Sequence, residues 1–311
     1  MKHRPKHIAE YAALRAVSGI VNILPYRLAM VFGWLLAALA YLLARGRVVR
    51  ARDRIREVFG QELDTHAVNR AAWISLRNVF FNGVEMMRVR RLIPAEVERT
   101  TDREGFEKVL DHAHAGKGGI LVVPHMGNWD LAGVGAHMLG LPIFLIVGKQ
   151  KNPLTDAWLN RVRGVTGIEL VPRDSSVLKK AIRSLREGKI LTFMTDLRSK
   201  TPGVVVRFFG KEANVVGGMA LFARQAGVPI FPAVVTRVGW TRHRWRVFDP
   251  IHPDPAIDKE ADWQRMTQQV MDIFDKAARE EPEQYFWYNK RWILDPLEPQ
   301  DQQHQTSNAK H

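Results

Sequence analysis

The chain has 311 residues, no cysteine, and 46 Lys and Arg against 32 Asp and Glu, which gives a formal charge of +14. The lack of cysteine excludes disulfides, thiol catalysis and Cys-ligated zinc. The positive charge favours anionic partners such as acidic headgroups, phosphorylated substrates, an acidic protein or nucleic acid. The length allows a full α/β core, in one large domain or two.

Residues 1–60 have the composition of a membrane anchor followed by a basic helix. The run 28–44 carries no charge, and as a helix rising 1.5 Å per residue it would reach about 26 Å, just short of the usual hydrocarbon thickness. It could span the bilayer, lie at its surface with 16–26 as a partner broken at Pro25, or form a buried core helix. We expect an anchor. A cleaved signal peptide fits less well, because arginines follow the apolar run.

The segment after this run is strongly basic. Six arginines lie between residues 45 and 56, and apolar residues recur among them at helical spacing. Such a helix binds anionic lipid, and the positive-inside bias favours the cytoplasmic side of the inner membrane. A solvated helix or a nucleic-acid-binding helix would carry the same charge. No nucleic-acid-binding motif accompanies it, so nucleic acid is not expected as a partner.

Strands and helices alternate from about residue 105 onward, after a further expected helix over 66–92. The alternation predicts an α/β fold with a central, mainly parallel sheet flanked by helices. We expect an α/β domain over 61–298 and a polar, Gln-rich, disordered tail over 299–311. The expected helices are 105–114, 129–139, 153–164, 176–187, 216–226 and 260–280, and the expected strands are 119–124, 142–148, 168–172, 189–195, 204–209, 229–236 and 243–249.

A histidine follows the most apolar of these strands. Pro124 ends the strand, so His125 is expected at its carboxyl end, where open α/β sheets place their ligands. Asp130 would lie in the first turn of the next helix. A carboxylate that holds one imidazole nitrogen leaves the other as a base near neutral pH. The pattern therefore predicts His125 as a general base with Asp130 as its partner, although a histidine after a strand is often merely packed or solvated.

Other polar residues follow neighbouring strands. Basic residues lie between Lys149 and Arg163, and of these Arg163 is the strongest candidate to neutralise a phosphate or carboxylate. Asp196 follows the strand 189–195, where it could bind substrate, orient a base or cap the strand end, and Arg198 is a candidate oxyanion donor.

A glycine-containing segment joins a strand to a helix between Gly210 and Gly217. Small residues there would let the backbone approach a ligand, and the helix start would offer N–H donors. The chain has no Walker loop, no G-x-S-x-G elbow and no metal-ligand spacing of histidines. These absences favour direct group transfer with His125 as base, with no covalent enzyme intermediate, no metal and no cofactor.

The motif His125-Met-Gly-Asn-Trp-Asp130 resembles the H-x4-D/E motif of the glycerophospholipid acyltransferase superfamily. With Gly-Asn-Trp inside, it is similar to the late lipid A acyltransferases, the lauroyl and myristoyl transferases, and to the phosphatidylinositol mannoside acyltransferase. Lipid A enzymes commonly carry Glu where this chain has Asp130. The resemblance covers most of the chain from about 20 to 292, and further blocks in order are Asn152-Pro153-Leu154, Thr195-Asp196, Phe209-Gly210-Lys211 through Gly217, and Pro282 to Trp287.

This resemblance implies transfer of an acyl chain from a thioester, on acyl carrier protein or coenzyme A, to a hydroxyl of a membrane-embedded acceptor. It implies that His125 deprotonates the acceptor with Asp130 as partner, and that Arg163 and Asp196 lie in the active-site cleft. Substrate contacts are also expected from Asn128, Trp129, Lys149, Arg198, Gly210 and Gly217. Met126, Trp129, Leu131 and Phe208 could line an acyl channel, although core packing explains each equally well.

The acceptor stays open among lipid A precursors, other glycolipids and ornithine lipids, and the basic surface suits either an acidic carrier protein or a phosphorylated lipid. Two other classes of protein fit the same residues. A hydrolase would pass the acyl group to water, and a binding protein would use the charge without chemistry.

Overall fold

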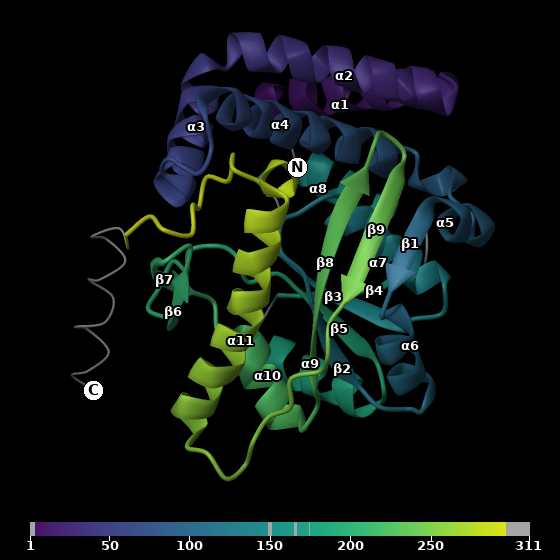
Figure 1. Ribbon diagram of the computed structural model, residues 1–311. Helices are drawn as coiled ribbons and strands as arrows, with labels where there is room; N and C mark the ends of the chain where they lie inside the picture. Colours follow the sequence, from purple (N-terminus) through teal and green to yellow (C-terminus); the bar gives the residue numbers. More distant parts are fainter. Residues whose placement is uncertain (1–3, 149–150, 165–166, 174, 297–311) are drawn as a thin grey trace.

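The computed structural model describes residues 4–148, 151–164, 167–173 and 175–296, which form a central sheet with helices on both faces and a helical layer across one end (Figure 1). The seven strands of the sheet have the order β1-β9-β8-β2-β5-β3-β4, and every pair is parallel except β8 with β9. Their bounds are β1 (Thr101–Glu104), β2 (Gly119–Val122), β3 (Ile143–Val147), β4 (Glu169–Pro172), β5 (Ile190–Phe193), β8 (Ile230–Val238) and β9 (Arg242–Val247).

Strand β2 lies at the centre of the sheet, between β8 and β5, and all four of its residues are buried. The residue just before the strand must be glycine, because a Cβ on Gly118 would lie 1.8 Å from the carbonyl oxygen of Leu185. The register pairs Val122 with Phe193 of β5. Because the two strands are parallel and in register, the residues that follow them emerge side by side at the carboxyl edge.

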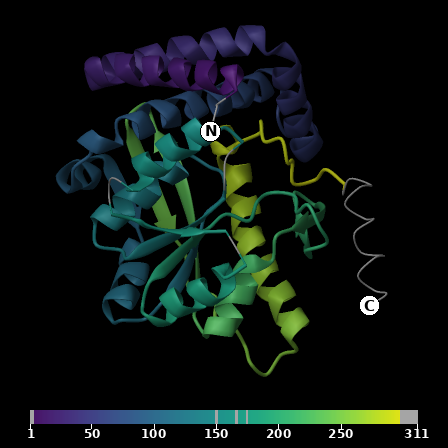
Figure 2. The same cartoon turned by 180° about the vertical axis from the view of Figure 1, so that it is seen from behind.

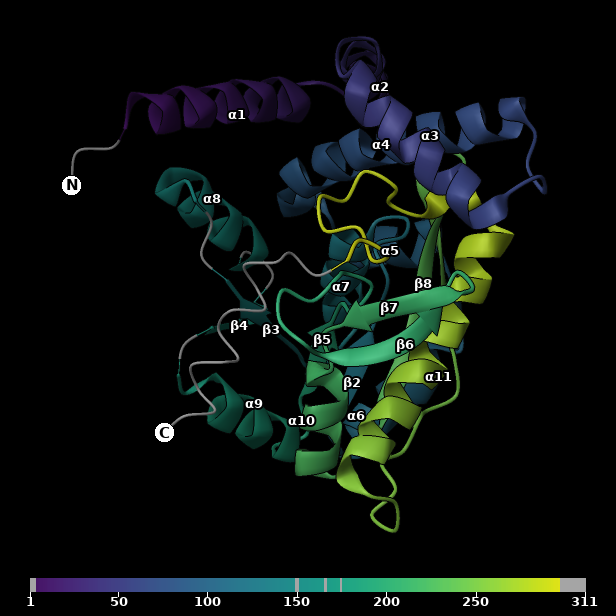
Figure 3. The ribbon, with the colours of Figure 1, turned by 90° about the vertical axis from the view of Figure 1, so that its left-hand side faces the viewer.

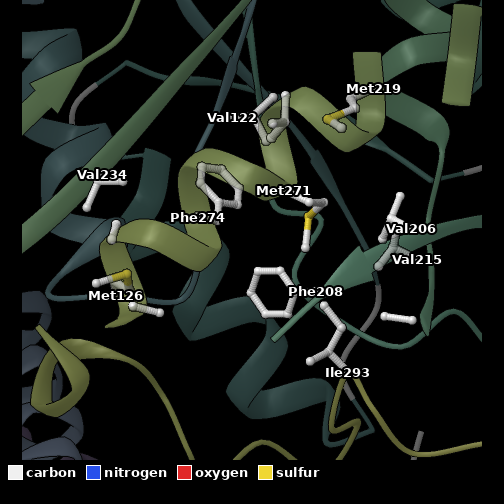
Figure 4. Packing of buried hydrophobic residues seen from close by; sticks show 14 of the residues in the cluster. Val122, Met126, Val206, Phe208, Val215, Met219, Val234, Met271, Phe274 and Ile293 are labelled. Carbon is white, nitrogen blue, oxygen red and sulfur yellow. The ribbon is translucent and has the colours of Figure 1, made fainter. Parts of the chain in front are cut away.

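Two apolar clusters hold helices against the two faces of the sheet. On one face α9 (Val177–Arg186), α10 (Gly218–Ala226) and α11 (Lys259–Glu280) contribute to one cluster, and on the other α6 (Phe106–His114), α7 (Trp129–Met138) and α8 (Pro153–Gly164) contribute to the second. Met271 and Phe274 of α11 pack in the first cluster near Val122, as the close view shows (Figure 4). Figure 2 shows the same arrangement from behind.

A two-stranded antiparallel hairpin, β6 (Val204–Phe208) and β7 (Lys211–Val215), packs on α11 beside the main sheet. The sequence predicted β6 but not β7, and it also missed β1 and the short helix α5 (Pro94–Thr100). Strand β7 is polar and only two of its five residues are buried, so it lacks the apolar run that identifies a buried strand. The other predicted helices and strands after residue 105 are confirmed to within a few residues at each end.

The helical layer consists of α1 (Pro5–Ile23), α2 (Tyr26–Leu43), α3 (Arg45–Phe59) and α4 (Thr65–Met87), with the 3₁₀ turns Val89–Arg91 and Pro282–Gln284 nearby. Helix α2 lies across α4, and a Cβ on Gly33 would come 2.8 Å from Val84 of α4 (Figure 1). Helix α1 extends away from this contact and lies over α8, where the Asn152 amide donates to Glu10 at 3.0 Å (Figure 3).

Within the described residues, α2 is the one helix long and apolar enough to cross a membrane, and 22% of its 18-residue window is buried. It is therefore not the buried core helix that the sequence left open. Helix α3 instead packs into the main core through Ile55 and Phe59, and Arg54 donates to the carbonyl of Trp287 at 2.8 Å. The predicted disordered tail, 299–311, lies outside the described residues.

Candidate active site

His125 and Asp196 meet at the carboxyl edge of the sheet, just past β2 and β5. The imidazole Nδ1 lies 2.7 Å from Asp196 Oδ1, and the backbone N–H of His125 donates to Asp196 Oδ2 at 2.8 Å. The Asp196 side chain is 1% exposed and that of His125 is 12% exposed. One carboxylate thus fixes both the ring and the backbone of His125, while part of the ring remains accessible.

This contact defines which nitrogen of the ring is free to act as a base. A carboxylate only accepts hydrogen bonds, so the proton of the neutral ring lies on Nδ1 and Nε2 carries the lone pair. Burial lowers the pKa of His125, but the charge and hydrogen bond of Asp196 outweigh burial, and Asp130 adds to them, so the pKa is raised above its usual value. The result is a stronger base that is neutral only at correspondingly higher pH.

The sequence predicted Asp130 as the residue that holds the imidazole, and the structure corrects this. Asp196 accepts the hydrogen bond from Nδ1, while Asp130 lies near enough for its charge to raise the pKa of His125. The reason is topological, because β5 lies directly beside β2 in the sheet. The loop after β5 therefore brings Asp196 to Nδ1 of His125, the contact that the sequence spacing had predicted for Asp130.

The turn after His125 is fixed by backbone pairing with the segment 284–286. Phe286 N–H donates to the His125 carbonyl at 2.9 Å, and Gly127 N–H donates to the Gln284 carbonyl at 3.1 Å. Gly127 has φ +57°, and a Cβ there would lie 2.5 Å from the Val235 carbonyl oxygen, so only glycine fits. Burial and the neighbouring Asp196 carboxylate raise the pKa of Tyr285, which keeps its phenol protonated.

One aromatic side chain of the motif faces the imidazole. The Trp129 ring lies edge-on to His125 with a centroid distance of 4.9 Å, and Phe286 follows at 6.2 Å from Trp129. Trp129 is partly exposed, as a substrate contact requires. Met126 and Phe208 are both 0% exposed within the core cluster, so the structure makes them core residues and not lining of a channel.

Positive charge gathers on the same edge of the sheet. Burial, and then Arg198 and Arg173, lower the pKa of Arg291, whose own charge opposes protonation of His125. Arg198 Nη1 donates to the Pro296 carbonyl at 2.7 Å, and Arg291 Nε donates to the Arg198 carbonyl at 3.0 Å. Arg291 was missed from the sequence, because it lies in an aromatic segment far along the chain with no motif to mark it.

Three other residues predicted to contact substrate, Asn128, Gly210 and Gly217, have structural roles within the protein. Asn128 is 1% exposed, and its amide caps α7 by accepting from Leu131 N–H while donating to Glu85. Gly210 lies in the β6–β7 turn with φ +76° after Phe209 at φ +53°, the pair of positive values that a tight hairpin turn needs. These two residues therefore have roles in local structure, and their contact with substrate stays a prediction.

Gly217 lies nearer Asp196, at the start of α10. Thr195 Oγ1 donates to the neighbouring Val216 carbonyl at 3.1 Å, and a Cβ on Gly217 would lie 2.4 Å from Val204 Cγ2. Close packing against Val204 thus accounts for this glycine. Lys149 and the side chain of Arg163 lie outside the described residues.

Comparison with known proteins shows similarity to lipid acyltransferases. The chain is 25% identical over 187 residues to the phosphatidylinositol mannoside acyltransferase of Mycolicibacterium smegmatis, covering 58% of this chain and 59% of that protein. It is 24% identical over 195 residues to the lipid A biosynthesis acyltransferase of Haemophilus influenzae, with 61% and 58% covered. A further match is the phosphatidylinositol mannoside acyltransferase of Mycobacterium tuberculosis, 25% identical over 222 residues with 68% and 66% covered.

The matches thus span about three fifths to two thirds of these curated relatives. The model of the bacterial lipid A biosynthesis acyltransferase family, in contrast, matches residues 3–293, which is nearly the whole chain and includes α1 to α4, the His125 motif and the segment that pairs with it. The chain belongs to the bacterial lipid A biosynthesis acyltransferase family.

Proposed function

We propose that this protein transfers a fatty acyl chain from a thioester to a hydroxyl of a lipid A precursor or a similar glycolipid at the membrane. The observation that carries the proposal is the dyad, an imidazole held on Nδ1 by the buried Asp196 at 2.7 Å and open on its other side. Family membership supports the reaction class, and the dyad gives that reaction a base.

In the proposed reaction His125 Nε2 takes the proton of the acceptor hydroxyl as its oxygen attacks the thioester carbonyl carbon. The attack forms a C–O bond and places negative charge on the carbonyl oxygen. Asp196 stabilises the imidazolium, and the positive charges of Arg198 and Arg291 favour the oxyanion. When the tetrahedral intermediate collapses, the C–S bond breaks and the leaving thiolate takes the proton from His125. The enzyme returns to its starting state without a cofactor.

The donor is acyl carrier protein or coenzyme A, and the acceptor is an anionic lipid. Both donors carry a phosphopantetheine phosphate, and a lipid A precursor is phosphorylated as well, so each suits the positive edge formed by Arg173, Arg198 and Arg291. Phosphatidylinositol mannoside or an ornithine lipid is the alternative acceptor. Two of the matched relatives are named for the former.

We place the catalytic domain at the cytoplasmic face of the inner membrane, held by α1 to α3. On α2 the side chains facing α4 are buried, whereas Leu35, Leu39 and Leu42 on the opposite side are more than half exposed. One side of this helix packs against protein along its length, and the opposite side is apolar and exposed. Such a helix fits a position parallel to the membrane, within one leaflet. The exposed arginines of α3 would then meet anionic headgroups.

The test supplies radiolabelled acyl carrier protein thioester or acyl-coenzyme A with vesicles that contain the extracted membrane lipids. A transferase labels lipid and releases little free acid, and His125→Ala abolishes the labelling. Release of free fatty acid in place of labelled lipid would show a hydrolase. Binding to vesicles without either product, unchanged by His125→Ala, would show a non-catalytic membrane protein. Mass spectrometry of the labelled lipid names the acceptor and the chain length together.

A further inference from the structure

A buried carboxylate that the proposed reaction does not use lies on α4, directly behind the catalytic turn. Glu85 is 4% exposed and forms a two-point ion pair with Arg237, at 2.9 Å from Nη1 and 2.5 Å from Nη2. His243 Nε2 lies 3.2 Å from the same carboxylate. Burial alone would raise the pKa of Glu85, but Arg237 and His243 hold it far below its usual value, so the carboxylate stays charged at any pH at which the enzyme works.

The carboxylate reaches the catalytic turn through an amide. Asn128 Nδ2 donates to Glu85 Oε2 at 2.6 Å, and the Oδ1 of the same amide caps the first turn of α7. A second link runs beside it, because Asn82 Nδ2 donates to the Gly127 carbonyl at 2.6 Å while Arg237 donates to Asn82 Oδ1 at 2.8 Å. The turn between His125 and α7 is thus fixed from α4 through one ionic cluster.

The same carboxylate also contacts the anchor. Tyr26, the first residue of α2, donates its phenol hydrogen to Glu85 Oε1 at 2.8 Å. Close by, Arg88 at the end of α4 donates to the Leu24 carbonyl at 2.8 Å, which fixes the junction between α1 and α2. Tyr26, Glu85 and His243 share the wall of a cavity of about 90 Å³ with Leu131 of α7.

We propose that Glu85 is a positioning residue that sets the catalytic turn relative to the anchor helix, by holding Asn128 on one oxygen and Tyr26 on the other. The inference rests on the proposed function, since the turn matters only if His125 is the base. Glu85 itself does not touch the reacting atoms. When α2 is seated on α4, Tyr26 completes the cluster, and His125 and Trp129 are held in place for a substrate that arrives from the membrane.

The experiment is a double-mutant cycle of Glu85→Gln and Asn128→Ala in the vesicle assay. Glutamine keeps the shape of the side chain but removes the charge that orients the Asn128 amide. We expect each single variant to lower kcat by about 10- to 100-fold with KM within about twofold, as for other residues that orient a catalytic group. Because Asn128 is the direct link from Glu85 to the turn, Glu85→Gln should cause a much smaller further loss in the Asn128→Ala background, the remainder acting through Arg237 and Asn82.

Asp262→Asn provides a matched control. Asp262 is also buried, at 0% exposure, and pairs with Arg224 at 2.6 Å, but it lies near the start of α11, at the opposite end of the domain from the dyad (Figure 1). Both substitutions leave an arginine without its carboxylate, so both should lower Tm. The NMR signals of the His125 ring should shift in Glu85→Gln and remain unchanged in Asp262→Asn.

Three results would overturn the proposal: a kcat loss from Glu85→Gln no larger than that from Asp262→Asn, additive losses in the cycle, or an unchanged His125 ring signal. If Glu85→Gln does not fold, Tyr26→Phe replaces it. That change removes one hydroxyl, and kcat should fall several-fold with the fold retained, whereas full activity would contradict the proposal. A wild-type protein that transfers no acyl group would instead overturn the proposed function, which the ring signal does not test.

Discussion

Two carboxylates act on the His125 imidazole, and they do so in different ways. Asp196 accepts the Nδ1 hydrogen bond, whereas Asp130 raises the pKa of the ring through its charge. We therefore expect Asp196→Asn to lower kcat by about 10²- to 10⁴-fold, the range of a lost acid–base function, and Asp130→Asn to lower it less. Labelled lipid formed per enzyme, with circular dichroism to check the fold, measures both. An equal or larger loss in Asp130→Asn would show that the hydrogen bond is not the dominant contact.

The pH dependence of the reaction follows from the same residues. His125 must be neutral to accept a proton, so kcat/KM should rise with pH through a pKa that lies above the usual 6.5. Replacing Asp196 by Asn removes the negative charge that favours the protonated ring, so this limb should move to lower pH while the maximum rate falls. A pH–rate profile of each protein measures the shift. A limb that stays at the same pH in Asp196→Asn would show that His125 is not the group that titrates.

The turn between β2 and α7 depends on one glycine. Gly127→Ala would strain a backbone with φ +57° and also place a methyl group 2.5 Å from the Val235 carbonyl oxygen. Gly60 provides a matched control, since its φ is +56° and nothing lies within 4 Å of its Cβ position. We expect about 1 to 3 kcal/mol of destabilisation in Gly60→Ala from the backbone alone, and a larger loss of unfolding free energy together with lost activity in Gly127→Ala. Urea unfolding compares the two, and equal losses would contradict the steric argument.

The elements that sequence predicted best are those with long apolar patterns. Strand β2 and helices α7, α8 and α11 agree with their predicted ranges to within a few residues, because their burial follows the apolar spacing. Strand β7 was missed because polar residues dominate it. The hydrogen bond to His125 was assigned to Asp130 for another reason, since local sequence spacing does not reveal the sheet order that brings β5 beside β2. Asp196 was singled out from the sequence, but its contact with Nδ1 needed the topology.

The helical layer gives the whole molecule an apolar side that faces away from the sheet. If α2 lies in the plane of the membrane, its two ends should reach the same depth, whereas a spanning helix would be deepest at its middle. The chain has no native cysteine, so single cysteines at Leu28, Leu35 and Leu42, all exposed, can be labelled with a fluorophore. Quenching by spin-labelled lipids at known depths should be the same at all three. Deeper quenching at Leu35 alone would show a spanning helix.

The two hydrogen bonds from His125, one from the ring and one from the backbone N–H, to Asp196 also affect which hydroxyl of the acceptor is acylated. Because the same carboxylate holds Nδ1 of the ring and the backbone N–H of its residue, the ring does not turn to follow different alcohols, and its free lone pair points in a single direction. An acceptor that carries several hydroxyls must rotate until one of them meets that direction. A single product isomer, with every other alcohol on the sugar left unmodified, is the outcome that such a rigid base dictates.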